Sequence, residues 1–429
     1  MEPGEPPVKI EPAMGKAAVR SLLAAAAAAS LVFAAAAPTT NAEAATAAVS
    51  PPPKLPTTAE LLTVFGTGQQ LYGLNPDKQL PIASATKLMT VLVTLEHASL
   101  NEIVRDPNWH PAAADSQIEL VPGEPMSVHD LIVAMLVPSA DDAAEDLAYN
   151  VGGRSIPRFL EMMNRRARAL GLTHTHYTTP IGLDTPGNYS SASDLIKLAT
   201  YLLEHHPFFA HVVGLTQATL KTGYHPRHVV ARNTLLGRVP WIHGIKTGHT
   251  HDAGYVLVAD GSKHGMTLLS AVLGTPSEGM RDSSTLALLD WGFAHFRLAK
   301  PLKAGATVAR PTYNGEQSSR VDVLATKTVA WAIPKGRRLR IHLQLVHNLN
   351  GPLKRGARVG TATVLDASAP VAQVPLVLAR AIPGVSWATE VARFITKPYT
   401  LVPLIVAVLA LATALTVLRR TRRRAATPA

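Results

Sequence analysis

The segment Ser84-Ala85-Thr86-Lys87 places a hydroxyl and an amine three residues apart. On a helix, residues at this spacing lie on the same face, so the Lys87 amine can reach the Ser84 hydroxyl. Such an amine can take the serine proton while the serine oxygen attacks a carbonyl carbon. The same residues also fit an ordinary helix start with a serine cap and a solvated lysine. The pair therefore indicates a nucleophile with its own base only where further groups accompany it.

Two distant segments supply such groups. Ser139-Ala140-Asp141 follows an apolar run and precedes a helix-like stretch, and its serine hydroxyl could pass a proton between Lys87 and a leaving group. Lys246-Thr247-Gly248-His249 has the pattern of a β-strand edge. Its cation and hydroxyl suit the binding of a carboxylate, and its glycine lets a substrate backbone approach closely. Together the three segments predict one catalytic constellation.

Two other patterns are not assigned to this constellation. A second Lys-Thr-Gly at residues 221–223 lacks the residues that flank the first, so we interpret it as a surface turn. The chain has 17 His, including the pair His174 and His176. No carboxylate or third His falls at a recognised metal-ligand spacing, so no metal site is predicted.

Ser-x-x-Lys, then Ser-x-Asp, then Lys-Thr-Gly in this order resemble the three-motif signature of the penicillin-recognising serine enzymes, which comprise β-lactamases and penicillin-binding proteins. Longer stretches at residues 72–81, 168–184, 189–192 and 281–293 are similar to the D-alanyl-D-alanine carboxypeptidase branch, the low-molecular-mass penicillin-binding proteins. The resemblance runs from about residue 64 to 293 and continues more loosely into the β-rich sequence that follows.

The resemblance implies a role for each matched residue. Ser84 would attack the carbonyl of the penultimate D-alanine of a peptidoglycan stem peptide, the terminal D-alanine would leave, and water would release the acyl-enzyme. Lys87 would be the base, and Ser139 a further catalytic residue. The backbone N–H groups of Ser84 and His249 would form the oxyanion hole. Asp141 and the strand Lys246-Thr247-Gly248-His249 would bind substrate, with Lys246 and Thr247 holding the terminal carboxylate that β-lactams imitate. This mechanism uses no cofactor.

One residue departs from the family pattern. Asp141 stands where the family triplet ordinarily ends in Asn, whose amide both donates and accepts hydrogen bonds. An ionised Asp can only accept, and its charge favours protonated lysines, which works against a free amine at Lys87. The substitution bears on the rate, the pH optimum or the substrate preference of the reaction. It does not change the expected fold.

Three rival functions remain open from the sequence. A β-lactamase of the commonest serine class would add a deacylating Glu in a Glu-x-x-Leu-Asn segment, which is absent. An endopeptidase that cuts peptidoglycan cross-links would use the same catalytic groups on a larger substrate. The third rival is a non-catalytic, membrane-tethered wall-binding protein of the same fold, for which Asp141 would be the first sign of decayed activity.

Composition limits the other possibilities. The 429 residues contain no Cys, which excludes a disulfide scaffold and a thiol nucleophile. Five positive charges of the formal +11 belong to a C-terminal Arg cluster, which leaves +6 on the rest of the chain. This modest excess fits an anionic envelope surface better than a nucleic-acid partner.

Both ends carry apolar segments. Lys16 and Arg20 precede a long Ala-rich run, and small residues at a cleavage spacing follow, so residues 14–44 are predicted to be a secretory signal, with Met14 a possible true start. Residues 399–418 carry no formal charge and are long enough to span a bilayer, and the Arg-rich tail at 419–429 marks the cytoplasmic side. We therefore expect an extracytoplasmic protein, anchored in a bacterial cell membrane by a C-terminal transmembrane helix.

The remaining sequence predicts an order of parts: a linker at residues 45–58, a catalytic domain at 59–298 and a β-rich domain at 301–383. Residues 384–397 have apolar side chains near helical spacing, which fits either an amphipathic interfacial helix or a core helix. Helical patterns occur at 85–97, 127–135, 156–170 and 193–205, and strand patterns at 64–72, 256–259 and 267–274. The expected class is α/β with an antiparallel sheet. The resemblance adds a β-lactamase/transpeptidase-like fold, in which helices flank a five-stranded sheet and a helical subdomain borders the site.

Overall fold

The computed structural model describes residues 49–424, apart from residues 108, 110, 111, 113–115, 315, 347 and 348. The predicted signal at residues 14–44 lies outside the described residues, as do residues 425–429 of the Arg-rich tail.

A five-stranded antiparallel sheet organises the part of the chain before residue 296. Its strand order is β2-β1-β9-β8-β7, so β7 forms one edge. Successive side chains of a strand point to opposite faces of the sheet. On β8, Val256 and Val258 enter one core, whereas Leu257 and Ala259 enter the other. The strands are β1 Ala59–Val64, β2 Gln69–Leu74, β7 Ile242–Thr250, β8 Gly254–Lys263 and β9 Met266–Thr275.

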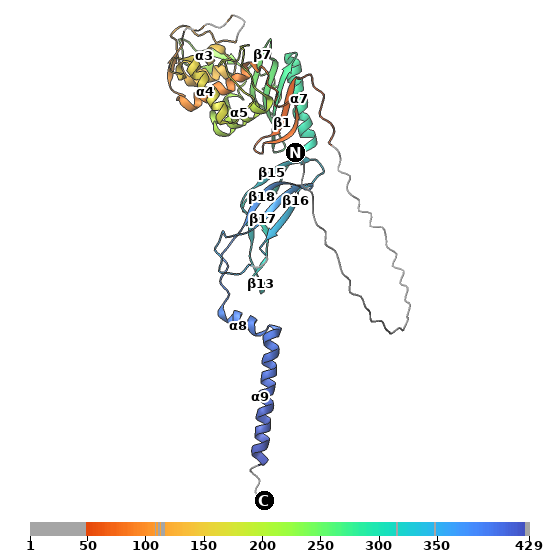
Figure 1. Ribbon diagram of the computed structural model, residues 1–429. Coiled ribbons are helices and arrows are strands. Elements are labelled where there is room, and N and C mark those ends of the chain that lie inside the picture. The colour runs from red at the N-terminus through yellow and green to blue at the C-terminus, as the bar shows by residue number, and fades with distance from the viewer. Residues whose placement is uncertain are drawn as a thin grey trace, which may run out of the picture. The chain divides into compact units, whose positions relative to one another are not determined.

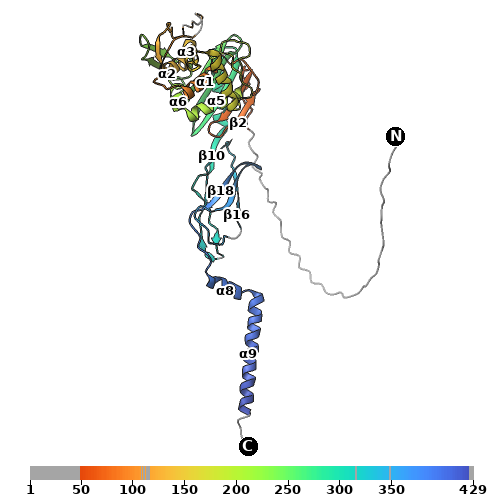
Figure 2. The same ribbon diagram turned by 60° about the vertical axis from the view of Figure 1, so that its left-hand side comes forward.

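Helices cover both faces of this sheet. The helix α7 (Glu278–His295) packs on one face through Leu288, Leu289 and Phe293, and the other described helices of this part lie on the opposite side (Figures 1 and 2). Those helices are α1 Lys87–His97, α2 Val128–Leu136, α3 Asp141–Val151, α4 Ile156–Ala169, α5 Ala192–His205 and α6 Pro207–Val212. Short two-stranded sheets join β3 Ile103–Arg105 with β4 Pro125–Ser127, and β5 Gln217–Leu220 with β6 Arg227–Val230.

Serine caps set the start of four of these helices. Ser127, Ser155, Ser191 and Ser277 each accept a hydrogen bond from the backbone N–H three residues on. A cap of this kind contributes about 1 kcal/mol. The helix α3 lacks a side-chain cap and instead begins with two carboxylates, Asp141 and Asp142, beside the positive end of its dipole. This acidic start faces the candidate site.

The chain continues into a β-rich segment, defined here as residues 296–383, with its own apolar core. A two-stranded sheet pairs β10 with β15, and a five-stranded sheet has the order β11-β14-β18-β17-β16. The strands are β10 Phe296–Leu302, β11 Thr307–Ala309, β12 Thr312–Tyr313, β13 Glu316–Arg320, β14 Val323–Ala325, β15 Val329–Pro334, β16 Arg340–Leu345, β17 Arg358–Asp366 and β18 Ala369–Leu378.

Two helices follow the β-rich segment. The helix α8 spans Trp387–Ile395 and α9 spans Pro398–Arg424. The stretch Tyr399–Arg422 is long and apolar enough to cross a membrane, with a mean hydropathy of 2.7 in its most apolar window of 18 residues. The exposed side chains of Trp387, Val391 and Phe394 on α8 argue against the core-helix alternative for this segment.

Most predicted elements agree with the structure to within two residues, and the α/β class with an antiparallel five-stranded sheet is confirmed. The strand predicted at residues 64–72 is wrong. It spans the turn between β1 and β2, where Gly66 and Gly68 adopt φ values of 77° and 67°. Glycine reaches this left-handed region at little cost, so two closely spaced glycines reverse the chain within an otherwise strand-like pattern.

Candidate active site

Ser84 lies in the 3₁₀ turn η1 (Ala83–Thr86), which leads directly into α1 and makes Lys87 the first residue of that helix. The fully buried Lys87 Nζ lies 2.9 Å from Ser84 Oγ. It also donates to Asp141 Oδ1 at 2.5 Å and to the Ile181 carbonyl at 2.9 Å. These three acceptors match the three N–H groups of an ammonium. The geometry therefore joins Ser84 to a lysine that forms an ion pair with Asp141.

A second lysine lies across the site. Lys246 Nζ, on β7, donates to Ser139 Oγ at 2.7 Å and to the Thr247 carbonyl at 2.9 Å. Burial lowers the pKa of Lys246 well below its usual value, and the positive charge of Lys87 adds to the effect, while Asp141 opposes it. Ser139 lies between α2 and α3 with a φ of 67°. The sequence predicted a proton path from Ser139 to Lys87, whereas the structure joins Ser139 to Lys246.

The strand β7 approaches η1 closely at Gly248. A Cβ atom at this position would lie 3.0 Å from the Ile82 carbonyl oxygen and 3.1 Å from the Ser84 backbone nitrogen. Only glycine allows this spacing without displacement of backbone. Gly248 therefore holds the strand against the turn that carries Ser84, and the backbone of His249 follows directly.

The variant Gly248→Ala is expected to slow acylation by a fluorescent penicillin about tenfold, because the added Cβ displaces the backbone at Ser84 by less than the 1 Å that can cost about a hundredfold at a catalytic centre. Gly279→Ala on α7 is the matched control, since nothing lies within 4 Å of a Cβ there. Stopped-flow labelling would measure both rates. Equal rates for Gly248→Ala and the unmodified protein would show that the close approach is dispensable.

A polar cavity of about 290 Å³ opens at these residues. Arg232 and Arg281 line it, and Arg281 is buried with Glu278 and Asp282 as ion-pair partners. Together with Lys246 these guanidinium groups favour an anionic ligand, such as a carboxylate. The cavity is lined by Ser84, Ser116, Ser139, Asp141, Gly182, Leu183, Arg232, Thr247, Gly248, His249, Thr250, Tyr255, Glu278 and Arg281.

Several of these lining residues were not predicted as site residues. Arg232 and Ser116 stand in segments without a recognisable local motif, and only the fold brings them to the cavity. Arg281 begins a stretch that resembles the family, which was the available signal for it. The His249 ring stacks on Tyr255 at 3.9 Å, so the imidazole is held on the strand by an aromatic contact.

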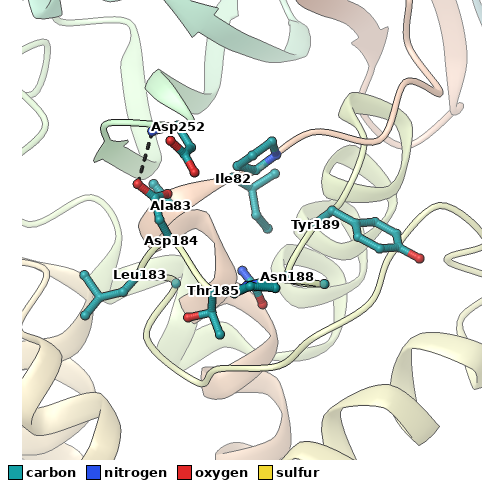
Figure 3. A pocket seen from close by; sticks show the side chains of 12 residues that line it. Ile82, Ala83, Leu183, Asp184, Thr185, Asn188, Tyr189 and Asp252 are labelled. Carbon is teal, nitrogen blue, oxygen red and sulfur yellow. Dashed lines mark hydrogen bonds between the residues drawn. The ribbon is translucent and has the colours of Figure 1, made fainter.

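A second cavity, of about 440 Å³, adjoins the first and shares Gly182 and Leu183 with it (Figure 3). Gly182, Leu183 and Asp184 lie on one loop. A Cβ on Gly182 would lie 2.0 Å from the Ala83 carbonyl oxygen, so this loop packs directly on η1. The Asp252 backbone N–H donates to Asp184 Oδ2 at 3.1 Å, which ties the loop to the turn after β7. The loop thus forms a wall between the two cavities.

Buried carboxyl groups extend along α3 behind the site. Asp142 accepts hydrogen bonds from the backbone of Ile118 and Leu120 and so fixes the loop that contains Ser116. Burial raises the pKa of Glu145 to about 7, with a further contribution from the charge of Asp141. Burial also raises the pKa of Asp146 to about 8, assisted by the nearby charges of Asp106, Asp142 and Glu124.

These raised pKa values predict how stability depends on pH. Between about pH 4 and pH 8 the folded state holds protons on Glu145 and Asp146 that the unfolded chain has lost, so the free energy of unfolding falls as pH rises through this window. Asp146→Asn removes one such group and is expected to stabilise the protein at pH 8 by about 1–3 kcal/mol relative to pH 5. Urea unfolding at the two pH values would measure the difference. The exposed Asp290→Asn is the control, and an equal gain there would contradict the assignment.

The second Lys-Thr-Gly is a structural turn. Thr222 donates to Asp130 Oδ2 at 2.7 Å through both its backbone N–H and its hydroxyl, and the Lys221 backbone N–H donates to the same oxygen. The interpretation as a turn is confirmed, since residues 221–226 connect β5 to β6. Within the described part of the chain, no group of three or more His, Asp or Glu side chains is arranged to hold a metal ion.

Known proteins share both the sequence and the fold. Residues 45–277 match the family model of D-alanyl-D-alanine carboxypeptidases, Peptidase S11, and residues 296–383 match the model of the penicillin-binding protein 5 C-terminal domain. The D-alanyl-D-alanine carboxypeptidase DacC of Escherichia coli is 33% identical over 340 residues, which cover 75% of this chain and 82% of that protein.

Solved structures agree with this match. Penicillin-binding protein 5 from Haemophilus influenzae is 29% identical, with a TM-score of 0.65 over 78% of this chain and 99% of that one. Penicillin-binding protein D2 from Listeria monocytogenes, solved in an ampicillin-bound form, is 30% identical with a TM-score of 0.51 over 57% of this chain and 100% of that one. The resemblance noted in the sequence is thereby confirmed, and the chain belongs to the D-alanyl-D-alanine carboxypeptidase family, the serine peptidases of the penicillin-binding type.

Proposed function

We propose that this enzyme removes the terminal D-alanine from peptidoglycan stem pentapeptides, with Ser84 as the nucleophile. The observation that carries the proposal is the 2.9 Å contact between Lys87 Nζ and Ser84 Oγ beside the Lys246 strand. Ser84 Oγ forms an ester with the penultimate D-alanine carbonyl carbon, the peptide C–N bond breaks, and water later hydrolyses the ester. Backbone N–H groups of Ser84 and His249 stabilise the oxyanion in both steps.

Proton transfer in this proposal involves both lysines. Lys87 accepts the proton of Ser84 only as a free amine, and the carboxylate of Asp141, 2.5 Å from Lys87 Nζ, favours the ammonium form and so slows this step. The leaving D-alanine amine then needs a proton. The Ser139 hydroxyl supplies it and is itself reprotonated from Lys246, whose nitrogen lies 2.7 Å away. In deacylation Lys87 returns its proton to Ser84 Oγ, and Lys246 regains a proton from the attacking water through Ser139.

Lys246 also binds the substrate carboxylate together with Thr247. Lys246→Ala is therefore expected to lower kcat/KM for a D-Ala-D-Ala peptide about a hundredfold, because a charge-assisted hydrogen bond is lost. Lys221→Ala is the matched control, since it changes the same residue of the other Lys-Thr-Gly, where the side chain is exposed. D-alanine release would measure both. A similar loss in the two variants would contradict a specific role for Lys246.

β-Lactams are proposed as covalent inhibitors that acylate Ser84. The support is the family membership, together with the ampicillin-bound form of the related Listeria protein. The cavity of about 290 Å³ with its cationic lining suits a small ligand that bears a carboxylate.

The enzyme is proposed to act outside the cell membrane, anchored by α9. The apolar stretch Tyr399–Arg422 and the Arg-rich end that follows support this orientation. A cleaved signal at residues 14–44 belongs to the same proposal, as does the division into a linker at 45–58, a catalytic domain at 59–298 and a β-rich domain at 301–383. The family models, which end at 277 and begin at 296, support that division.

Product analysis tests the reaction and separates it from its rivals. Incubation with a pentapeptide is expected to release D-alanine, whereas cleavage of a cross-linked dimer without D-alanine release would identify an endopeptidase. A non-catalytic protein is the alternative that the Lys87–Asp141 ion pair favours, because that pair opposes a free amine. Such a protein would yield no product from either substrate.

A further inference from the structure

Charge is distributed unevenly between the two main parts of the chain. The β-rich segment contains fourteen Lys and Arg against three Asp and Glu. Residues 49–295 have the opposite balance, with 17 basic and 22 acidic residues. The modest net charge of the whole chain conceals this difference. A folded segment this basic attracts an anionic surface or polymer.

Six of these cations gather at one end of the β-rich sheet. The strand β17 begins there and pairs with the end of β18, which also pairs with the start of β14. The same segments contribute two acidic residues, Asp322, which forms an ion pair with Arg310, and Glu316. The six cations are exposed and form the set that we call the basic end: Arg310, Arg320, Lys354, Arg355, Arg358 and Arg380.

The chain leaves the β-rich segment at this basic end. Ile382 bridges to Leu353, which immediately precedes Lys354 in the sequence, and Gly384 bridges to Gly351. In Figure 1, β13 marks the end of the segment from which the chain continues toward α8. From Arg380 to the start of the apolar stretch at Tyr399 there are only 19 residues. The basic end is therefore held close to any membrane that α9 crosses.

The linking helix has the chemistry of a membrane interface. Trp387, Val391, Phe394 and Ile395 recur at helical spacing on α8, so they share one face, and all four are exposed. An exposed aromatic and aliphatic face beside a span suits the boundary between headgroups and acyl chains. The described chain thus presents, in order, a basic end, an apolar helix face and a span.

We propose that the basic end of the β-rich segment binds the anionic phosphate headgroups of the membrane in which α9 is anchored. This inference rests on the anchor of the proposed function and adds a second, electrostatic contact. The contact orients the β-rich segment on the membrane surface. It thereby also sets the place at which the preceding part of the chain joins this segment. Anionic wall polymers also carry phosphate, but the closeness of the basic end to the span favours the lipid.

Full-length protein in lipid nanodiscs provides the test. The chain has no Cys, so Ala381→Cys introduces a single site for a fluorophore within the basic end. Nitroxide-labelled lipid headgroups quench that fluorophore when the basic end lies on the surface. We expect strong quenching in discs with anionic phosphatidylglycerol and weak quenching in zwitterionic discs. Raising the salt to 1 M is expected to abolish the difference, because the screening length shortens to about 3 Å.

Two triple variants carry the same change of charge. Lys354→Gln, Arg355→Gln and Arg358→Gln neutralise the basic end, and each lost cation is expected to weaken surface association about fivefold. Lys335→Gln, Arg338→Gln and Arg340→Gln make the control. Arg340 pairs with Leu365 near the far end of β17, roughly 25 Å from Arg358 at the rise of an extended strand. We expect the first variant to lose quenching and the control to retain it.

Three results would overturn the inference. Quenching could be equal in anionic and zwitterionic discs, or the control variant could lose as much quenching as the variant of the basic end. The third result is binding of the basic end to a soluble poly(glycerol phosphate) with no quenching in anionic discs. Retention of the chain in discs tests α9 separately, and a chain that is not retained would remove both the anchor and this contact. Penicillin labelling of Ser84 in the same samples reports on the active site independently, and the two triple variants should leave it unchanged.

Discussion

Replacement of Ser84 by Ala is expected to abolish acylation by a fluorescent penicillin and to lower D-alanine release by about a factor of 10⁴ to 10⁶, the range observed when a nucleophile of this kind is removed. The reason is that the Ser84 hydroxyl lies 2.9 Å from Lys87 Nζ, with the Gly248 strand against the Ser84 backbone. Gel fluorescence measures the label, and mass spectrometry of the digested protein locates the adduct on the peptide that contains Ser84.

Ser283→Ala is the control for this prediction. Ser283 is an exposed serine on α7 whose hydroxyl donates only to the Met280 carbonyl within its own helix, so its loss should leave the labelling rate unchanged. Persistent label on Ser84→Ala would identify another nucleophile. Because the change removes one oxygen atom, a circular dichroism spectrum should be unaltered, and a misfolded variant would be recognised.

The fold was predictable where local periodicity decides structure. Helices such as Ile156–Ala169 carry a serine cap and an apolar stripe, and strands such as Met266–Thr275 alternate between two cores. The hairpin of β1 and β2 was misread because its turn residues interrupt a strand-like pattern for only four positions. The family resemblance supplied the five-stranded sheet, and only the structure gives its strand order.

In the candidate site, too, some contacts follow from local sequence spacing, and others are determined only by the fold. The position of Lys87 beside Ser84 follows from three-residue spacing at a helix start, so the sequence was sufficient. The Ser139–Lys246 hydrogen bond joins residues that are 107 positions apart, and only the fold, which brings the connection between α2 and α3 beside β7, determines it. Arg232 and Ser116 reach the cavity for the same reason. The charge contrast between the two parts of the chain was present in the sequence but hidden by a whole-chain sum.

The Lys87–Asp141 ion pair leads to the second large effect. Asp141→Asn keeps the shape of the side chain and a hydrogen-bond acceptor but removes a charge 2.5 Å from the lysine. An opposite charge at such a distance favours the protonated amine, so its removal favours the free base. At neutral pH we expect penicillin acylation to become at least about tenfold faster. The acidic limb of the rate profile should shift to lower pH.

The same change is expected to act on stability in the opposite direction. Removing one partner of a buried ion pair leaves the other charge uncompensated, at a cost of about 3–5 kcal/mol. Lys87 can avoid that cost only by losing its proton, so the variant should be least stable in acid and should recover as pH rises. Asp252→Asn, an exposed carboxylate near the neighbouring cavity, is the control and should change neither property. A slower reaction with an unshifted pH profile would mean that Asp141 carries the lysine proton during catalysis, and that the departure from Asn is part of the mechanism of this enzyme.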